Sequence, residues 1–341
     1  MSCLLSSVDF LTTPGLIFDV RSPAEYEQGH IPGAMCLPLF TNEERAKVGT
    51  CYKRQGKEAA VELGLTIVGP KLADFVLQAK TFSRDRTVRV HCWRGGMRSN
   101  SMAWLLETAG FQVTVLQGGY KGFRRWVRET LAVQKPVLTL GGMTGTGKTA
   151  VLHAIAAQGE QIIDLEALAN HRGSSYGALG LPPQPTTEQF ENLLAVAWAK
   201  LDAHRPVWIE AESRMVGTCR IPNEIFDQMQ AAPIVQLERS RAERIAILTD
   251  VYGQAEQAEL IAATERITRR IGGLAAKQAI AHIRRNDLAP AIALVLDYYD
   301  KTYCYDLKRR PVPISTIPAT GLTASQAATH LIQTAAEWMA A

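Results

Sequence analysis

The sequence predicts an α/β protein built from two parallel-sheet domains, and three observations lead to this fold class. Short apolar runs alternate with segments of helical periodicity in the N-terminal part and again after Val137, which is typical of parallel sheets covered by helices. The chain has 341 residues, and at roughly 150 residues per domain this length indicates two domains. The composition, with 47% hydrophobic and 21% charged residues, is that of a globular protein and excludes disordered or collagen-like chains.

The first domain is expected to contain three buried strands and the helices between them. The apolar runs that predict the strands are LIFDV (16–20), VRVHC (88–92) and TVLQGG (114–119). Helical periodicity predicts helices over 70–80, 99–110 and 122–132, the second of them closed by Gly110 as its C-cap. The segment VQKP (133–136) interrupts this pattern. We therefore expect one domain over residues 1–133 and a second over 134–341.

The second domain begins with a strand over 137–140, followed by a glycine-rich loop and a helix from Lys148. Further strands of a parallel sheet are expected over 161–166, 206–213 and 233–240. From about residue 255 to residue 303 the periodicity is helical throughout, and a last amphipathic helix is expected over 324–340. This order predicts a P-loop NTPase-like α/β domain with a helical C-terminal part.

The segment GMTGTGKT (142–149) fits the P-loop spacing G-x-x-x-x-G-K-[ST], with a strand before it and a helix after it. Glycines let such a loop curl so that its amides face a phosphate, and the helix N-terminus adds a partial positive charge. Lys148 can bridge the outer phosphates, and the Thr149 hydroxyl can hold Mg²⁺. The predicted phosphate-binding residues are Gly142, Gly145, Gly147, Lys148 and Thr149.

An acid near the P-loop usually accompanies the Mg²⁺ ion, and Glu210 fits this role best because it ends an apolar strand. Glu212 and Asp164 are the alternatives, and each of the three could equally be a salt-bridged structural acid. The six cysteines contain no C-x-x-C pair, which excludes a disulfide framework and a zinc pattern. No dedicated metal site of the protein itself is predicted.

A second motif, HCWRGGMRS (91–99), places Cys92 at the end of a strand, before a tight loop into a helix. Loop amides, a helix N-terminus and the side chains of Arg94 and Arg98 all favour the thiolate, and such settings lower a cysteine pKa from about 8.5 to roughly 3.5–7.5. The two arginines would also hold an oxyanion of the phosphate type. We predict Cys92 as the nucleophile and a structural role for the remaining cysteines, which are Cys3, Cys36, Cys51, Cys219 and Cys304.

The segment FDVRSPAEYEQGHIPGA (18–34), the cysteine loop and LQGGYKGF (116–123) together resemble a rhodanese domain. This resemblance implies transfer of sulfur or selenium through a persulfide-type intermediate on the cysteine. The usual loop of that family is C-x-x-G-x-R-S, whereas Cys92 to Arg98 holds one residue more, as in rhodanese-like phosphatases. The longer loop widens the anion cradle and argues against simple thiosulfate transfer. Asp19 and Arg21 match the first rhodanese motif and are expected to orient the loop, and His91 is given no catalytic role.

The whole chain resembles the tRNA 2-selenouridine synthase family, including GTCYKRQGKEAAVELGL (49–65), DLEALANHRGSSYGALG (164–180) and WIEAESRMVG (208–217). The resemblance implies exchange of sulfur for selenium at the wobble 2-thiouridine of certain tRNAs. It implies selenophosphate as the selenium donor, and hence an enzyme that supplies it. It also implies a geranyl diphosphate-dependent step that first makes S-geranyl-2-thiouridine. We expect the P-loop to hold the prenyl diphosphate and Cys92 to carry the selenium.

Three basic clusters are candidates for contact with the anticodon arm of a tRNA, although the net charge is only +4. One contains Arg266, Arg269, Arg270, Lys277, Arg284 and Arg285, and the others are Lys308 to Arg310 and Lys121 to Arg128. For any one cluster alone, a solvated helix face is the plainer interpretation. Arg172, in a polar loop after a strand of the P-loop domain, is a candidate substrate contact, with a surface cap as its alternative.

Two other classes of function stay open at this point. One is a phosphatase or an ATP-dependent rhodanese-type sulfurtransferase acting on another substrate, and the other is a non-catalytic, RNA-binding sensor with a nucleotide switch. The scattered cysteines, the absence of an apolar run of about 18 residues and an N-terminus without a basic signal region lead us to expect a cytoplasmic protein. The oligomeric state is not predicted.

Overall fold

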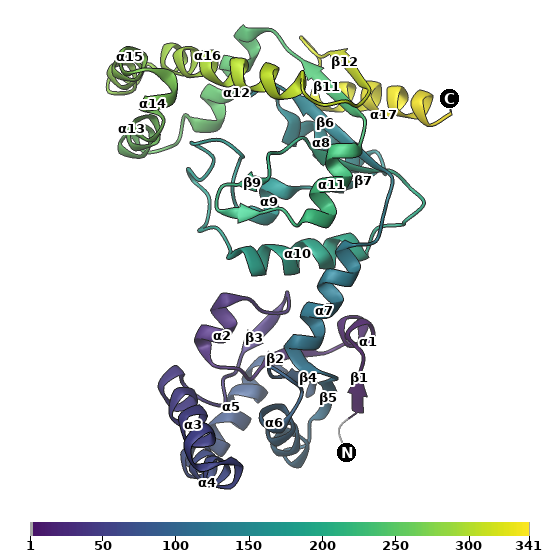
Figure 1. Cartoon of the computed structure of the whole chain (residues 1–341), viewed down its shortest axis with the longest axis vertical. Helices are drawn as coiled ribbons and strands as arrows, with labels where there is room; N and C mark the ends of the chain where they lie inside the picture. The colour runs from purple at the N-terminus through teal and green to yellow at the C-terminus, as the bar shows by residue number, and fades with distance from the viewer. Residues whose placement is uncertain (1–2, 341) are drawn as a thin grey trace. The chain divides into compact units, whose positions relative to one another are not determined.

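The structure is a computed structural model that describes residues 3–340, with side chains up to Trp338. Residues 1, 2 and 341, the outermost residues of the two expected domains, lie outside the described residues. Contacts divide the chain into two compact units, Met1–Thr130 and Leu131–Ala341 (Figure 1). Both units are of the α/β class with parallel sheets, which confirms the predicted fold class.

The first unit is built on a five-stranded parallel sheet. Its strand order is β1 (Cys3–Leu5), β5 (Gln112–Leu116), β4 (Thr87–His91), β2 (Leu16–Asp19) and β3 (Ala34–Cys36). Strands β2, β4 and β5 confirm the three predicted from apolar runs, except that β5 ends at Leu116 and the last residues of the strand expected over 114–119 form a turn and the start of the next helix. The edge strands β1 and β3 were not predicted, because three residues are too few to show a periodicity.

Helices connect the strands of this sheet and pack against them. Three of them, α5 (Leu72–Phe82), α6 (Met97–Thr108) and α7 (Gly119–Leu131), correspond to the helices expected from periodicity. The others are α1 (Ser7–Thr12), α2 (Pro23–Gln28), α3 (Asn42–Gln55) and α4 (Lys57–Val68), with a short 3₁₀ turn over Gly69–Lys71. Gly110, expected as the C-cap of α6, lies one residue beyond the actual C-cap, Ala109. Its φ of 84° is a left-handed conformation that glycine adopts without strain.

The second unit contains a second five-stranded parallel sheet. Its order is β12 (Ile314–Pro318), β11 (Ile234–Glu238), β6 (Val137–Gly142), β8 (Val207–Glu210) and β7 (Gln161–Ile163). A small antiparallel hairpin, β9 (Met215–Val216) with β10 (Cys219–Arg220), lies outside it. Strand β12 was not predicted. The strand expected over 161–166 is longer than the observed β7. The Asp164 side chain accepts a hydrogen bond from the amide of Ala167 and so starts helix α9 (Leu165–Ala169).

The helices of the second unit fall into two groups. One group packs around the sheet: α8 (Lys148–Ala157), α10 (Thr187–Ala199), α11 (Asn223–Ala231) and α17 (Ala324–Ala340). The other forms the helical part. It begins with α12 (Arg241–Tyr252), ahead of the expected start at about residue 255, and continues with α13 (Gln257–Arg266), α14 (Thr268–Ile271), α15 (Gly273–Ile283) and α16 (Leu288–Leu307). Figure 1 shows α13, α14 and α15 gathered at one end of α16. No helix within residues 3–340 is both long and apolar enough to cross a membrane.

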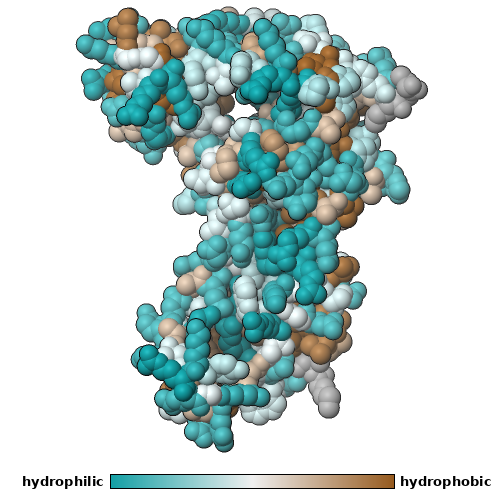
Figure 2. Space-filling view, viewed as in Figure 1, coloured by the Kyte–Doolittle hydropathy of each residue, from teal (hydrophilic) through white to brown (hydrophobic). Residues whose placement is uncertain are grey.

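The distribution of polar and apolar residues on the surface is that expected for helices packed on a core. In Figure 2 the viewed face is mostly hydrophilic, with separate hydrophobic patches that include part of the α13–α15 region. Leu274 of α15 has 73% of its surface exposed, whereas Ala276, Ala279 and Ile283 of the same helix are buried. The helix therefore buries one face against α16 and leaves the other in solvent.

Candidate functional site

The first site surrounds Cys92, which directly follows β4 and is 3% exposed. Its loop is fixed by the start of α7, because the amides of Tyr120 and Lys121 donate to the carbonyls of Cys92 and Trp93 at 2.8 and 2.9 Å. Gly119 has a φ of 59°, and a Cβ at this position would collide with the backbone of the cysteine loop. This close approach explains why a glycine stands at the start of α7.

The environment of Cys92 favours its thiolate. Burial alone would raise the pKa of the thiol, but hydrogen bonds from Ser99 and from the amides of Arg94 and Gly96 outweigh it, so that the pKa is lowered. The Ser99 Oγ lies 3.3 Å from the Cys92 Sγ. The groups that stabilise the thiolate are thus the loop amides and one hydroxyl.

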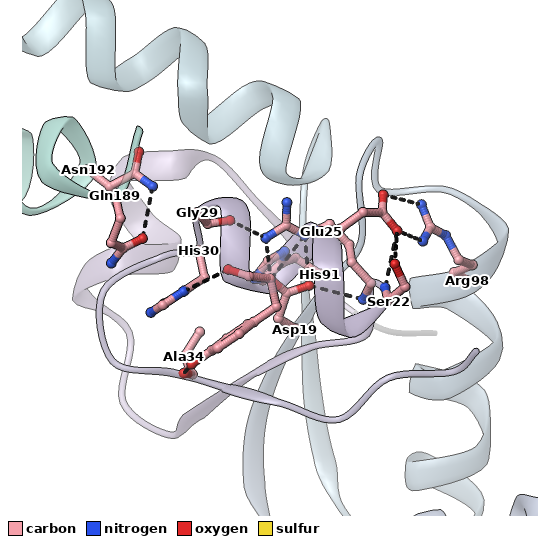
Figure 3. A network of polar contacts seen from close by, with 12 residues as sticks. Asp19, Ser22, Glu25, Gly29, His30, Ala34, His91, Arg98, Gln189 and Asn192 are labelled. Atoms are coloured by element: carbon pink, nitrogen blue, oxygen red, sulfur yellow. Dashed lines mark hydrogen bonds and ion pairs between the residues drawn. The ribbon is translucent and has the colours of Figure 1, made fainter. Parts of the chain in front are cut away.

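The two arginines of the loop have different surroundings. Arg98 donates to Glu25 at 2.8 Å, and Figure 3 shows the two side chains facing each other with Ser22 beside Glu25. Arg94 is exposed. The sequence analysis did not foresee the carboxylate opposite Arg98, because Glu25 lies far away in the chain. In this structure the Arg98 guanidinium is therefore paired with a carboxylate.

Asp19 and Arg21 form a buried ion pair beneath the loop. The Arg21 Nη2 lies 2.5 Å from the Asp19 Oδ2 and 2.6 Å from the carbonyl of Gly29, and the guanidinium stacks 3.7 Å from the ring centre of Tyr120. Burial lowers the pKa of His91 to about 4, so its ring is neutral at physiological pH. These groups connect β2, the 20–30 segment and α7 and do not contact the thiol. Such an arrangement is typical of residues that hold the cysteine loop in place.

The second site lies at the carboxyl ends of the central strands of the second unit. Gly142, Gly145 and Gly147 have φ values of 143°, 84° and 78°, conformations that the curled loop requires and that L side chains rarely adopt. The Lys148 Nζ donates to the Gly142 carbonyl at 3.1 Å, and α8 begins at Lys148. The Gly142 amide donates to the Tyr303 hydroxyl at 2.7 Å.

Three carboxylates meet beside this loop. Oxygens of Glu166, Glu210 and Glu212 lie within 4.8 Å of one another, and the Thr149 hydroxyl donates to Glu166 at 3.2 Å. Glu210 is 1% exposed, and neither of its carboxylate oxygens has a hydrogen-bond partner within the described residues. Orphaned buried carboxylate oxygens beside a P-loop threonine fit the oxygen ligands that Mg²⁺ prefers.

The electrostatics of the cluster agree with this fit. Burial and the neighbouring carboxylates raise the pKa of Glu166 to about 9 and that of Glu210 to about 7, and burial also raises the pKa of Glu212. Burial would lower the pKa of Lys148, but the three glutamates outweigh it and raise the pKa. One ammonium group does not neutralise three carboxylates, so the cluster holds excess negative charge when all are ionised.

The structure separates the three acids that the sequence analysis proposed as Mg²⁺ ligands. Glu210 and Glu212 both belong to the cluster, whereas Asp164 caps α9 and lies 2.7 Å from His153. Sequence reasoning missed Glu166, which had been placed in a strand instead of a helix. The turn at Asp164, an N-cap residue after a short apolar run, is the signal that could have found it.

Arg172 belongs to the loop that follows α9. Its Nη1 donates to the Leu179 carbonyl at 2.7 Å, which closes the loop. Gly173 has a φ of 65°, and a Cβ there would lie 2.8 Å from a carboxylate oxygen of Glu212. The loop backbone therefore runs directly against the acidic cluster at a glycine.

The basic residues of the helical part lie on its surface. Arg269, Arg270, Lys277, Arg284 and Arg285 are exposed, and within the described residues none of them forms an ion pair with an acid. Arg266 donates to the Ser175 carbonyl at 2.8 Å.

Comparison with known proteins covers both units. Residues 135–328 match the family described as the tRNA 2-selenouridine synthase AAA domain, and residues 8–125 match the rhodanese-like domain. The tRNA 2-selenouridine synthase of Shewanella oneidensis is 35% identical over 330 residues, which cover 86% of each chain. The chain belongs to the tRNA 2-selenouridine synthase family.

Other tRNA 2-selenouridine synthases show a similar likeness. That of Pseudomonas putida is 37% identical over 309 residues, covering 86% of this chain and 82% of its own. That of Bordetella petrii is 36% identical over 333 residues, covering 86% and 87%. Among solved structures, an N-terminal domain from Clostridium difficile 630 is 42% identical and covers 36% of this chain and 98% of its own, with a TM-score of 0.35.

Proposed function

We propose that this enzyme replaces the sulfur of a wobble 2-thiouridine in tRNA with selenium, in two steps at two separate sites. The observation that carries this proposal is the pairing, in one chain of this family, of a stabilised thiolate with a phosphate loop beside a carboxylate cluster. The thiolate supplies a nucleophile, and the loop supplies a place for a diphosphate. An enzyme that only hydrolysed a nucleotide would have no use for Cys92.

The first step is alkylation of the thiouridine sulfur by geranyl diphosphate at the P-loop. The sulfur attacks the allylic carbon, the carbon–oxygen bond breaks and diphosphate leaves, while the base loses its N3 proton to give neutral S-geranyl-2-thiouridine. Lys148 and the loop amides hold the diphosphate as its charge grows. Mg²⁺, held by Thr149, Glu210 and the neighbouring glutamates, would stabilise the leaving diphosphate.

The second step exchanges geranylthiol for selenium from selenophosphate and uses Cys92. A selenium atom bound to the cysteine sulfur is the intermediate that the rhodanese fold supports. Forming this intermediate from selenophosphate is a two-electron oxidation of the selenium and the cysteine sulfur. It requires an oxidant such as a disulfide, and it releases phosphate. The terminal selenium then attacks C2 and expels geranylthiolate, and a thiol reduces the remaining selenium–sulfur bond, which returns the two electrons.

A second role for Cys92 is favoured by the length of its loop. Selenium has the same oxidation level in selenophosphate and in 2-selenouridine, so the exchange can also proceed without redox chemistry. Selenophosphate selenium would displace geranylthiolate directly, and the Cys92 thiolate would then take the phosphoryl group, which water removes. The extra residue between Cys92 and Arg98, shared with rhodanese-like phosphatases, supports this route. Phosphorus and selenium NMR of the trapped adduct would distinguish the two.

The tRNA is expected to lie along the exposed basic residues of α13 to α15. A surface of unpaired arginines and lysines releases counterions when it binds a phosphate backbone, so affinity should fall steeply with salt. Replacing Arg269 and Arg270 with alanine should weaken binding of the anticodon arm and flatten this salt dependence, and neutral replacement of exposed Arg84 serves as the control.

Mass spectrometry of nucleosides tests the two-site assignment. A 2-thiouridine stem-loop is incubated with Mg²⁺ and geranyl diphosphate, and selenophosphate is added in a second stage. We expect the geranylated base with the wild type and Cys92→Ser but not with Lys148→Ala, and selenium only with the wild type. Hydrolysis of ATP without any geranylated base would overturn the proposal in favour of an ATP-dependent sulfurtransferase.

A further inference from the structure

A tryptophan directly follows the nucleophile in the cysteine loop. Trp93 keeps 38% of its surface exposed, whereas Cys92 keeps only 3%. A cradle for a small oxyanion is built from amides, hydroxyls and cations, and the amides of Arg94 and Gly96 and the Ser99 hydroxyl already supply hydrogen bonds here. Trp93 adds a large apolar side chain that such a cradle does not need. An exposed aromatic ring beside a nucleophile is available to a larger ligand.

The ring of Trp93 rests on a buried aromatic ring. Its centre lies 5.9 Å from that of Tyr120, at an interplanar angle of 42°, and Tyr120 is completely buried. The Arg21 guanidinium stacks 3.7 Å from the Tyr120 ring centre on that support. The Trp93 carbonyl accepts a hydrogen bond from the Lys121 amide at 2.9 Å. Because the ring is supported before any ligand arrives, less conformational entropy is lost when a ligand binds to its exposed part.

Two exposed cations accompany Trp93. Arg94 is the next residue, and Lys121 is joined to Trp93 by the backbone hydrogen bond. Among the described residues, neither side chain forms an ion pair with an acid. An aromatic ring on which a base can stack, next to cations that contact phosphates, is typical of sites for single-stranded nucleic acids.

A second exposed tryptophan of the same unit lacks this setting. Trp104 lies on α6 and keeps 62% of its surface exposed. Its helical neighbours three and four residues away carry no positive charge: Asn100, Ser101, Glu107 and Thr108. Within the part of the chain that the structure describes, its ring packs against no other aromatic ring. Support and positive charge are therefore combined at the tryptophan next to the nucleophile and not at the other.

The reacting base has to leave its neighbours in the anticodon loop, because its C2 must reach a thiol that is almost completely buried. A base turned out of its stack regains stacking energy on an aromatic side chain. We propose that the wobble base stacks on Trp93 while Cys92 acts in the exchange at C2. Arg94 and Lys121 contact the adjacent phosphates. This inference rests on the proposed exchange step at Cys92 and makes Trp93 a substrate-binding residue that orients the base.

Protection of Cys92 from iodoacetamide measures binding at this site alone. Each full-length protein is alkylated at increasing RNA concentrations, and mass spectrometry of the peptide that contains Cys92 gives the concentration that halves the rate. Three anticodon stem-loops are compared, which carry uridine, S-geranyl-2-thiouridine or an abasic nucleotide at the wobble position. The proteins are the wild type, Trp93→Ala and Trp93→Phe, with Trp104→Ala as the matched control. The rate without RNA serves as the reference for each protein.

The proposal predicts a loss that depends on the presence of the base. Trp93→Ala should raise the half-protection concentration of the uridine and geranylated stem-loops by roughly five- to 150-fold, the worth of one base stacked on an aromatic ring. The abasic stem-loop should bind the wild type more weakly by a similar factor, and Trp93→Ala should weaken it no further. Trp93→Phe should keep part of the affinity, because a phenyl ring also offers a π face. Trp104→Ala should behave as the wild type.

Lys121→Ala separates the phosphate contact from stacking. It should raise the half-protection concentration of all three stem-loops by a similar factor, because the abasic RNA keeps its phosphates. The effect should shrink as the salt concentration is raised. A loss confined to the two stem-loops that carry a base would contradict the phosphate contact of Lys121.

Other outcomes would overturn the role of Trp93. They are a lack of protection by RNA in the wild type, equal half-protection concentrations in the wild type and Trp93→Ala, and an equal loss with the abasic stem-loop. A loss with the geranylated stem-loop alone would mean that Trp93 contacts the alkyl chain and not the base. Failure of the proposed function looks different, because the wild type would then transfer no selenium to the geranylated stem-loop whatever the pattern of protection.

Discussion

The cysteine site and the P-loop site differ in how their charges are balanced. Around Cys92, Arg21 pairs with Asp19 and Arg98 pairs with Glu25, and the pKa of each of these carboxyls is lowered even though burial opposes it. Around Lys148, one ammonium group faces three glutamates, whose pKa values are all raised. In the free protein, the buried charges of the first site are therefore balanced by ion pairs. The second is completed by a cation or by protons, and the comparison therefore predicts different responses to substitution, pH and Mg²⁺.

The largest effect should come from removing the reactive group of one site while the other stays intact. Cys92→Ser should reduce selenium incorporation by at least about 10³-fold, since a nucleophile cannot be replaced by binding alone. Lys148→Ala should reduce alkylation by roughly 10²–10³-fold through loss of charge stabilisation. Supplying synthetic S-geranyl-2-thiouridine RNA should restore selenium incorporation to Lys148→Ala but not to Cys92→Ser. Restoration in both, or in neither, would contradict two independent sites.

The two units should respond to pH in opposite directions. The pKa of Asp19 is lowered in the fold, so its stabilising contribution is present above the usual value of 3.8 and is lost as the pH falls through its folded value. The pKa values of Glu166 and Glu210 are raised to about 9 and about 7, so their contribution is present below the usual value of 4.5 and is lost as the pH rises through the folded values. The protection of the β2 and β4 amides from hydrogen exchange should therefore fall in acid. The protection of the β6 and β8 amides should fall in mild alkali.

Mg²⁺ should remove only the alkaline response. At a hundred times its Kd, a ligand that binds the folded state adds about 2.7 kcal/mol of stability, and here it would act on the second unit alone. Glu210→Gln removes one of the like charges, so it should protect β6 and β8 in alkali without Mg²⁺ and weaken the response to Mg²⁺. Glu224→Gln, which alters an exposed acid of α11 in the same unit, is the control. Equal Mg²⁺ protection in wild type and Glu210→Gln would remove Glu210 from the cation site.

Local motifs made much of both sites predictable, and long-range contacts account for the rest. The P-loop glycines and Lys148 could be named because a phosphate cradle is built from consecutive residues, and the same holds for the Cys92 loop. Glu25 and Glu166 could not, because each reaches its site from another element, opposite Arg98 and Thr149 respectively.

The Glu25–Arg98 pair gives a smaller effect that separates support from catalysis. Arg98→Ala should lower selenium incorporation by roughly ten- to a hundredfold, the cost of a charge-assisted hydrogen bond to an oxyanion. Arg45→Ala is the matched control, because Arg45 also faces Glu25, at 3.7 Å, but is 53% exposed. The measurement is kcat/KM for selenophosphate with pre-geranylated RNA. If both variants lose activity equally, Arg98 only neutralises Glu25.

The smallest effect should come from Ser99, whose hydroxyl stabilises the thiolate from 3.3 Å. Ser99→Ala removes one of the hydrogen bonds that lower the pKa of Cys92, so that pKa should rise and the thiolate should form at higher pH. At neutral pH the rate of selenium incorporation should fall by about two- to tenfold, the worth of one hydrogen bond, and it should recover as the pH is raised. Ser101→Ala, an exposed change on the same helix, should leave the profile in place. Titration of the thiol by the rate of alkylation with iodoacetamide measures the shift directly. A loss of rate that is the same at every pH would mean that Ser99 positions the loop and does not stabilise the thiolate.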